Sequence, residues 1–243
     1  VDHVVMGSLG FLDVYNEKSR AFLRAFLPFM LAGVIFDSMR YFYWHGVAGR
    51  VHTLGPYELD RHLFGVHGHT LNELFAVHHW AIADLASGIA YLTFIGAYLA
   101  LAFVAFLRGN SAGARTLGRC FLMVNVLGFI TYFIFPVAPP WYVAAHGFGA
   151  VTHAAPPSAA AAHRFDVLLG THFFDGVYNH GVDAFGALPS LHCAYPFMGA
   201  VLAFRIPQLR WLRWPAVAFS ALMCFSAVYL QHHYVIDVAL ALI

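Results

Sequence analysis

Long apolar stretches separated by short basic clusters dominate the pattern of this 243-residue chain. Since about 20 apolar residues cross a hydrocarbon core about 30 Å thick, such stretches predict membrane-spanning helices. We place these helices at about residues 21–44, 82–107, 120–135, 190–206 and 214–231, with a sixth beginning near Tyr234. The expected fold is therefore all-α, a polytopic membrane protein with six transmembrane helices.

The chain begins with Val1 and its last apolar stretch stops at Ile243. We therefore expect the full-length protein to extend beyond both ends, with the sixth span truncated here, and no cleavable signal is recognisable. No internal repeat or second domain is visible. Residues 1–243 are expected to form a single integral-membrane domain.

Composition supports the membrane assignment. Apolar residues make up 60% of the chain and charged residues 10%, against about 25% charged in a soluble domain. The net charge of +1, without a basic patch interleaved with aromatic residues, gives no sign of nucleic-acid binding. The cysteines, at Cys120, Cys193 and Cys224, lie in or beside apolar stretches without metal-ligand spacing, which favours buried free thiols.

The positions of the basic residues predict the orientation. Nine of the thirteen Lys and Arg residues lie at residues 18–24, 108–119 and 205–213, which all fall on one side of the predicted spans. The positive-inside rule assigns that side to the cytoplasm. Two long segments, residues 45–81 and 136–189, then lie on the opposite face. We expect an interfacial helix near residues 57–65 in the first and a loop at 154–159 in the second.

A His-Asp pair opens the last apolar stretch. His233 and Asp237 are four residues apart, so in a helix they share one face. The Asp could then accept a hydrogen bond from one imidazole nitrogen and leave the other free to attack an electrophile. The alternative is a pair that caps a helix end.

A second histidine lies near the start of the fourth stretch. Pro189 and Ser190 precede that stretch, Ser190 is a good N-cap, and His192 falls in the first turn. A helix N-terminus offers free N–H groups and positive potential, which suit a phosphate. His192 is then placed to protonate a leaving oxygen, although a capping role alone would also explain these residues. Both histidine motifs begin spans on the same membrane face.

These motifs carry a resemblance. Pro-Ser-Leu-His at residues 189–192, Ser226, and His-Tyr-Val-Ile-Asp at 233–237 resemble two signatures of the type 2 phosphatidic acid phosphatase superfamily. The resemblance implies that His233 forms a phosphohistidine, that His192 is the general acid and that Asp237 supports the nucleophile. The first signature of that family, with its Lys and Arg-Pro, is absent, and Ala227 stands where an Arg usually follows the serine.

Phe-Pro-Val-Ala-Pro-Pro-Trp-Tyr at residues 135–142 instead resembles the inositol phosphorylceramide synthase branch of that superfamily. This resemblance implies transfer of a phosphoinositol-type headgroup from a glycerophospholipid to a ceramide or diacylglycerol-like alcohol in the bilayer, without a cofactor or metal. A phosphodiester needs fewer cations than a monoester, which fits the missing Lys and Arg. The headgroup, the acceptor and the oligomeric state stay open.

The other basic residues, Arg40, Arg50, Arg61 and Arg164, are predicted on the catalytic face. An ionisable residue inside a span is costly and usually functional, which draws attention to Asp37 and Arg40. With Ser190, the candidate substrate-binding residues are Asp37, Arg40, Arg61 and Arg164. A structural ion pair explains Asp37 and Arg40 equally well, and Arg61 could simply contact lipid headgroups.

Rival functions remain. The nearest is a lipid phosphatase on the same scaffold, acting on a phosphomonoester or pyrophosphate lipid with water as the acceptor. A non-catalytic lipid-binding or transport protein is a rival from another class. The histidines between residues 67 and 79 lack the clusters of a di-iron oxygenase, and His232 is expected to be a bystander. An Arg-, Ala- and Gly-rich chain favours a bacterial inner membrane, with the active site facing the periplasm or exterior (the lumen in a eukaryote).

Overall fold

The structure is a computed structural model that describes residues 17–178 and 185–243. Within these ranges all regular elements are helical. The long helices are α2 (Glu17–Ser38), α6 (Ala81–Leu107), α7 (Ser111–Ile134), α11 (Leu191–Arg205) and α12 (Arg213–Tyr229). The short ones are α3 (Tyr43–Val47), α4 (Leu54–Phe64), α5 (Leu71–Val77), α8 (Pro140–His146), α9 (His163–Leu169), α10 (Phe173–Tyr178) and α13 (Val235–Ala241). Single 3-10 segments lie at η1 (Met39–Tyr41), η2 (Ala160–Ala162) and η3 (Pro207–Leu212).

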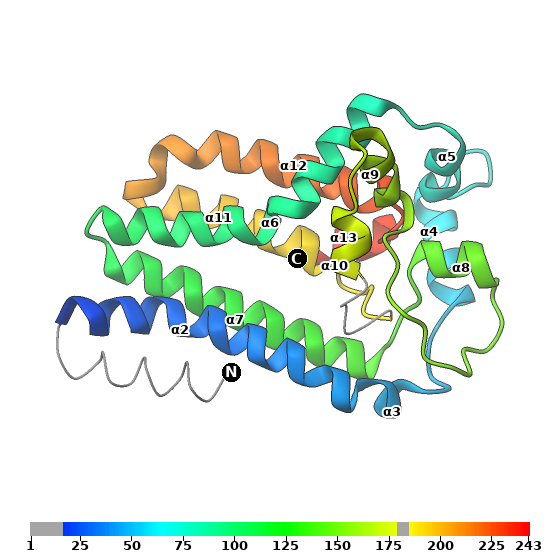
Figure 1. The fold of residues 1–243 in the computed structure, drawn as a ribbon, viewed down its shortest axis with the longest axis horizontal. Coiled ribbons are helices and arrows are strands. Elements are labelled where there is room, and N and C mark those ends of the chain that lie inside the picture. Colours follow the sequence, from blue (N-terminus) through cyan, green and yellow to red (C-terminus); the bar gives the residue numbers. More distant parts are fainter. Residues whose placement is uncertain (1–16, 179–184) are drawn as a thin grey trace.

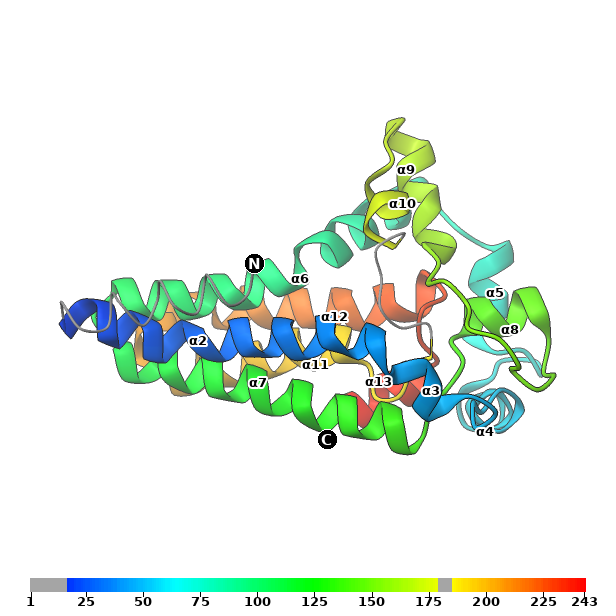
Figure 2. The same ribbon diagram turned by 60° about the horizontal axis from the view of Figure 1, so that its bottom comes forward.

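The long helices run side by side in one bundle, and most of the short helices gather at one end of it (Figures 1 and 2). α2 packs along α7, while α11 packs against α12, α6 and α7. Gly118 of α7 allows the closest approach to α2, since a Cβ at this position would lie 2.2 Å from the carbonyl oxygen of Ala25. Small residues at such crossings let helix backbones meet in a membrane.

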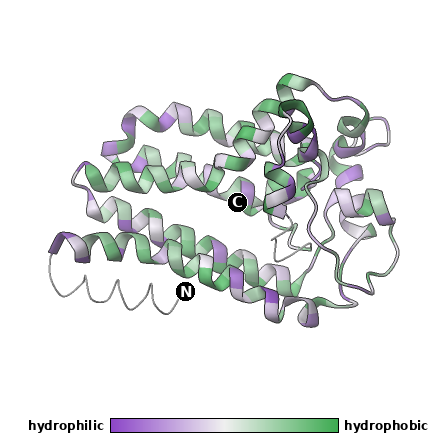
Figure 3. Ribbon diagram, viewed as in Figure 1, coloured by the Kyte–Doolittle hydropathy of each residue, from purple (hydrophilic) through white to green (hydrophobic). Residues whose placement is uncertain are grey.

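In the part of the chain that the structure describes, four helical segments are long and apolar enough to cross a membrane: Glu17–Tyr41, Ala81–Leu107, Ser111–Ile134 and Pro207–Tyr229. Only 28% to 39% of the most apolar window of each is buried inside the protein. The helices of the bundle consist largely of hydrophobic residues (Figure 3). Those apolar side chains that are not buried inside the protein would be costly to expose to water and suit contact with lipid tails.

The predicted fourth and sixth spans are shorter than expected. α11 covers residues 191–205 and has 15 residues, which corresponds to about 22 Å at about 1.5 Å per residue. α13 has 7 residues. The all-helical class is therefore confirmed, whereas among the described residues only four spanning helices are supported by length and composition, and the expected number of six is not confirmed.

The predicted start of the third span, residue 120, is wrong by nine residues, because α7 begins at Ser111. Asn110 caps this helix by accepting a hydrogen bond from the N–H of Gly113 at 2.8 Å. Arg115 and Arg119 consequently lie within α7 and not in a loop between spans. Hydropathy locates the apolar part of a helix, whereas the cap decides where the helix begins.

The predicted interfacial helix near residues 57–65 overlaps α4, which ends at Phe64, and residues 154–159 form a non-helical segment as expected. Residues 179–184, part of the expected segment 136–189, lie outside the described residues. The short helices α4, α5, α8, α9 and α10 therefore form a layer around the end of the bundle from which α11 starts (Figure 2).

Candidate active site

The N-terminus of α11 provides the first part of the site. Ser190 is its N-cap, as predicted, and its fully buried hydroxyl accepts a hydrogen bond from the N–H of Cys193 at 3.4 Å. The backbone N–H of Ser190 donates to the carbonyl oxygen of Asp237 at 3.1 Å. This bond joins the two histidine motifs, which are more than forty residues apart in the sequence.

The second part is the tight turn between α12 and α13. The backbone N–H groups of His232 and His233 both donate to the carbonyl oxygen of Ala227, at 3.2 and 3.0 Å. This turn directs the His233 side chain towards α11, where His233 Nε2 lies 3.0 Å from His192 Nδ1. The structure therefore brings the two histidines of the sequence motifs into direct contact.

A backbone carbonyl fixes the tautomer of His233. Its Nδ1 lies 2.9 Å from the carbonyl oxygen of Ala187, which can only accept a hydrogen bond. Nδ1 therefore carries the proton, and Nε2 keeps its lone pair on the side that faces His192. Sequence analysis did not identify Ala187, because a main-chain oxygen leaves no signature in residue type.

Asp237 is the more distant partner of His233. Its Oδ2 lies 3.6 Å from His233 Nδ1, and the same oxygen accepts the N–H of Tyr234 at 2.8 Å. The hydrogen bond to Tyr234 holds the carboxylate at the start of α13. Asp237 thus faces the imidazole as a fully buried carboxylate and favours positive charge on it.

Aromatic rings enclose the histidines. Tyr91 stacks on His192 with ring centres 4.6 Å apart, and Phe94 lies 4.8 Å from the same ring. Tyr91 also stacks on His232, at 5.1 Å. Such packing holds the imidazoles in place and keeps bulk water away from them.

His232, expected to be a bystander, belongs to this arrangement. Its ring stacks on Tyr178 at 5.0 Å, and one of its ring nitrogens, Nε2, lies 3.1 Å from the Tyr178 hydroxyl. Burial, together with the nearby His233, lowers the pKa of His232 to about 3. His232 therefore stays neutral at physiological pH and acts as a packing and hydrogen-bonding group.

The proline-rich segment at residues 135–142 is bonded both to the segment before α11 and to the turn that carries His233. The N–H of Val137 donates to Phe185 at 2.9 Å, two residues before the Ala187 carbonyl. The N–H of Trp141 donates to Gln231 at 3.1 Å, two residues before His233. The structure thus gives this motif a positioning role that its composition did not reveal.

Asn72 is a buried residue that sequence analysis missed. Its Nδ2 donates to the carbonyl oxygens of Val228 and His233 at 2.9 and 3.0 Å. Asn72 lies in the first turn of α5, where Thr70 and Glu73 form a capping box. The Thr-x-x-Glu spacing would have predicted this helix start, although not its contact with the catalytic turn.

Asp60 of α4 supports the turn from the other side. Its Oδ1 accepts the N–H of Ile236 at 2.9 Å, and the side chain is fully buried. Burial is the main cause that raises the pKa of Asp60 from 3.8 to about 6, and the nearby Asp237 adds to it. α4 thereby holds the beginning of α13 through a carboxyl group that is costly to ionise.

The raised pKa of Asp60 predicts that the stability of the folded protein depends on pH. Near pH 6 the folded protein still binds a proton that the unfolded chain has released, so the free energy of unfolding falls as pH rises from about 4 to about 6, by up to about 3 kcal/mol. Asp60→Asn should remove this slope and raise the melting temperature at pH 8. Thermal unfolding of the detergent-solubilised protein between pH 4 and pH 8 measures both. Asp37→Asn, at an exposed carboxylate, should keep the wild-type slope, and an unchanged slope in Asp60→Asn would contradict the assignment.

The candidate phosphate ligands do not all gather at the histidines. Arg40 pairs with Asp37 in an exposed ion pair at the end of α2. Arg61 is exposed and lies over the Tyr57 ring, 5.7 Å from its centre. Among the described residues, neither arginine has a hydrogen bond to His192 or His233.

Arg164 has a structural partner that sequence analysis missed. Its Nε lies 2.7 Å from Oδ1 of the buried Asp84, and its guanidinium lies over the Tyr229 ring at 4.8 Å. This ion pair joins α9 to α6 and α12. The carboxylate of Asp84 therefore largely neutralises the charge of Arg164.

Ala227, at the position where an arginine is usual, has a fully buried side chain. The packed core leaves no room for a guanidinium at this point. Over residues 17–178 and 185–243, no group of three or more His, Cys, Asp or Glu side chains is arranged to hold a metal ion. The described site therefore consists of two imidazoles, a buried carboxylate and main-chain groups.

Comparisons with known proteins show which family the chain resembles. Residues 57–243 match the PAP2 superfamily. The chain is 34% identical, over 99% of its length and 80% of the relative, to a protein of Bacteroides thetaiotaomicron named phosphoinositol dihydroceramide synthase. It is 29% identical to the inositol phosphorylceramide synthase of Candida albicans and 28% identical to the inositol phosphorylceramide synthase catalytic subunit of Saccharomyces cerevisiae, in each case over 71% of this chain. The matches cover 36% and 43% of these fungal proteins. No solved structure matches the chain significantly.

Proposed function

The chain belongs to the PAP2 superfamily, and on this premise we propose that it is a phospholipid headgroup transferase. The reaction moves a phosphoinositol-type headgroup from a glycerophospholipid to a ceramide or a similar lipid alcohol. One observation carries the proposal: Nε2 of His233, which carries no proton in the tautomer set by Ala187, lies 3.0 Å from Nδ1 of His192. A nucleophile and a proton donor are thereby held together.

The first half of the reaction forms a phosphohistidine. Nε2 of His233 attacks phosphorus, and His192, which enters this step as an imidazolium, donates a proton to the departing diacylglycerol oxygen as the P–O bond breaks. The present hydrogen bond between the imidazoles has to open so that the phosphoryl group can enter between them. Main-chain N–H groups at the start of α11 offer positive potential to the developing charge, and Asp237 stabilises the cationic His233.

The second half transfers the headgroup to the acceptor. His192, now neutral, removes the proton of the acceptor hydroxyl while that oxygen attacks the phosphohistidine. The P–N bond breaks and His233 recovers its lone pair. His192 therefore acts first as acid and then as base, and the aromatic rings around it disfavour attack by water.

Transfer is better supported than hydrolysis of a phosphomonoester. A dianionic monoester calls for several cations, whereas Ala227 replaces the usual arginine and Arg164 is already paired with Asp84. The relatives named above carry names of inositol phosphorylceramide or dihydroceramide synthases. A lipid phosphatase on the same scaffold is the alternative that the experiment below tests.

The membrane arrangement belongs to the same proposal. Residues 1–243 form one integral-membrane domain in which α11 and α13 add to the four long spans, six helices in all. The layer of short helices, α4 included, lies at the membrane interface. The active site faces the periplasm or exterior of a bacterial inner membrane, opposite to the face rich in arginine.

Purified protein incubated with headgroup-labelled phosphatidylinositol tests the function. With ceramide present, the label should move to ceramide and diacylglycerol should appear in equal amount. Without an acceptor, turnover should fall to a small fraction of that rate. Headgroup release at full rate without ceramide would identify a phosphatase, and donor binding without any turnover would identify a lipid-binding protein.

A further inference from the structure

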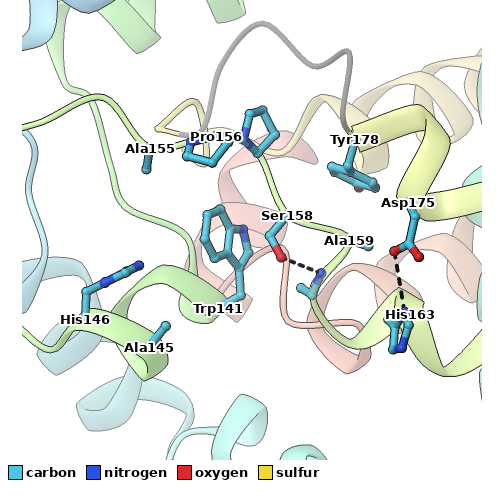
Figure 4. Close-up of a pocket in the computed structure, with 12 residues that line it drawn as sticks. Trp141, Ala145, His146, Ala155, Pro156, Ser158, Ala159, His163, Asp175 and Tyr178 are labelled. Carbon is cyan, nitrogen blue, oxygen red and sulfur yellow. Dashed lines mark hydrogen bonds and ion pairs between the residues drawn. The ribbon is translucent and has the colours of Figure 1, made fainter.

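A pocket of about 760 Å³ lies beside the catalytic turn, among the short helices. Residues of α8, of the segment at 155–160, of α9 and of α10 surround it (Figure 4). The side chains that give it polar character and aromatic surface are Trp141, His146, Ser158, His163, Asp175 and Tyr178. Neither His192 nor His233 lines it, so it is a space distinct from the catalytic pair.

The walls of this pocket are bonded to the residues that precede His233. The N–H of Trp141 donates to Gln231 at 3.1 Å, and the N–H of Ala161, which follows the lining residue Ala160, donates to Leu230 at 3.3 Å. The hydroxyl of Tyr178 lies 3.1 Å from the ring of His232. Through these bonds the pocket is held directly beside the turn that carries the nucleophile.

The chemistry of the lining suits hydroxyl groups more than a phosphate. Among the described residues that line the pocket, none is Lys or Arg, and the carboxylate of Asp175 would repel an anion. A carboxylate accepts hydrogen bonds from alcohols, and imidazoles and a serine hydroxyl can both accept hydrogen bonds from alcohols and donate to them. Trp141 adds an apolar ring face on which the C–H side of a saturated ring can pack. Few polar groups on an otherwise apolar wall are typical of a small-ligand site.

We propose that this pocket binds the uncharged polyol ring of the donor headgroup while its phosphate lies between His192 and His233. The inference rests on the proposed function and deepens it, because it assigns recognition of the headgroup to residues outside the catalytic motifs. Asp175 is the central acceptor for the ring hydroxyls, and Trp141 packs against the ring.

Two histidines next to Asp175 form a matched pair for testing. His163 Nδ1 lies 3.4 Å from Asp175 Oδ1, and His172 Nδ1 lies 3.5 Å from Asp175 Oδ2. Only His163 also lines the pocket, whereas the side chain of His172 is 88% exposed. Replacing either histidine by alanine removes an imidazole that lies beside the Asp175 carboxylate. Only the replacement of His163 also changes the wall of the pocket.

The test measures transfer from phosphatidylinositol to fluorescent ceramide in mixed micelles. Asp175→Asn and His163→Ala should each raise the KM for phosphatidylinositol about 10-fold, the effect of losing one hydrogen bond that involves a charged group. The KM for ceramide should stay at the wild-type value in both variants. His172→Ala should leave both KM values unchanged.

Calorimetric binding of glycerophosphoinositol to the full protein separates this inference from the function. The wild type and His233→Ala should bind it, Asp175→Asn should bind it about 10-fold more weakly, and glycerophosphoethanolamine should bind poorly to all. Binding that depends on Asp175 in a protein without transferase activity would reject the proposed function and keep the pocket assignment. Wild-type affinity and KM in both Asp175→Asn and His163→Ala would overturn the pocket assignment, as would equal binding of the two headgroups.

Discussion

Replacement of His233 by alanine is expected to lower headgroup transfer by roughly four orders of magnitude or more. The reason is geometric, since Nε2 of His233 is the imidazole nitrogen left with a free lone pair by the hydrogen bond of Nδ1 to Ala187. No phosphoenzyme should form in this variant. The measurement is quenching in alkaline detergent after mixing with donor labelled at phosphorus, followed by detection of an acid-labile, alkali-stable label on the protein.

His78→Ala is the matched control for that experiment, because His78 is an exposed histidine at the end of α5, outside the described catalytic pair. It should retain both the label and the turnover of the wild type. Labelled protein in the His233→Ala variant, or transfer within 10-fold of the wild type, would mean that another group is the nucleophile. Thermal unfolding of the variant separates this result from loss of the fold.

Replacement of His192 by alanine is expected to slow transfer from phosphatidylinositol by about 10²- to 10⁴-fold, the range that a positioned acid or base contributes. The diacylglycerol alkoxide is a poor leaving group without a proton from His192. In an analogue that carries the same headgroup phosphate on p-nitrophenol, the nitrophenolate is a good leaving group and departs without that proton. With this analogue, His192→Ala should release a burst of nitrophenol equal to the amount of enzyme.

After this burst, phosphoenzyme should accumulate, because the acceptor hydroxyl then lacks its base. His233→Ala should give no burst with the same analogue. The two variants therefore fail at different steps, which a purely structural role for both histidines would not produce. A normal rate with phosphatidylinositol in His192→Ala, or the absence of a burst with the analogue, would exclude His192 as the acid.

Several features of this site were accessible from the sequence. The spacing of His233 and Asp237, the N-cap at Ser190 and the position of His192 depend on helix periodicity and capping, which are local. Hydropathy located the long helices α2, α6, α7 and α12, and the motifs indicated the family. Charge counting predicted that both histidines lie on one face of the membrane, which remains part of the proposal.

Other features depend on contacts between distant segments. The carbonyl of Ala187 sets the tautomer of His233, and its chemistry does not depend on the identity of its residue. Asn72 of α5 and Asp60 of α4 form hydrogen bonds to the backbone of His233 and Ile236. Both lie more than 150 residues earlier in the chain than the residues they contact. The partner of Arg164 proved to be Asp84, so an arginine counted as a phosphate ligand has a structural role that only its neighbourhood reveals.

The sequence by itself determined the membrane class and the family, and it singled out His192 and His233 as candidate catalytic residues. It could do so because apolar periodicity and short motifs are properties of neighbouring residues. Only the tertiary structure decided which nitrogen of His233 is free, which cations are already paired and where a pocket lies beside the turn. These depend on distances between backbone and side-chain atoms of different helices. Such distances follow from how the bundle and its layer of short helices pack together, and no local pattern encodes them.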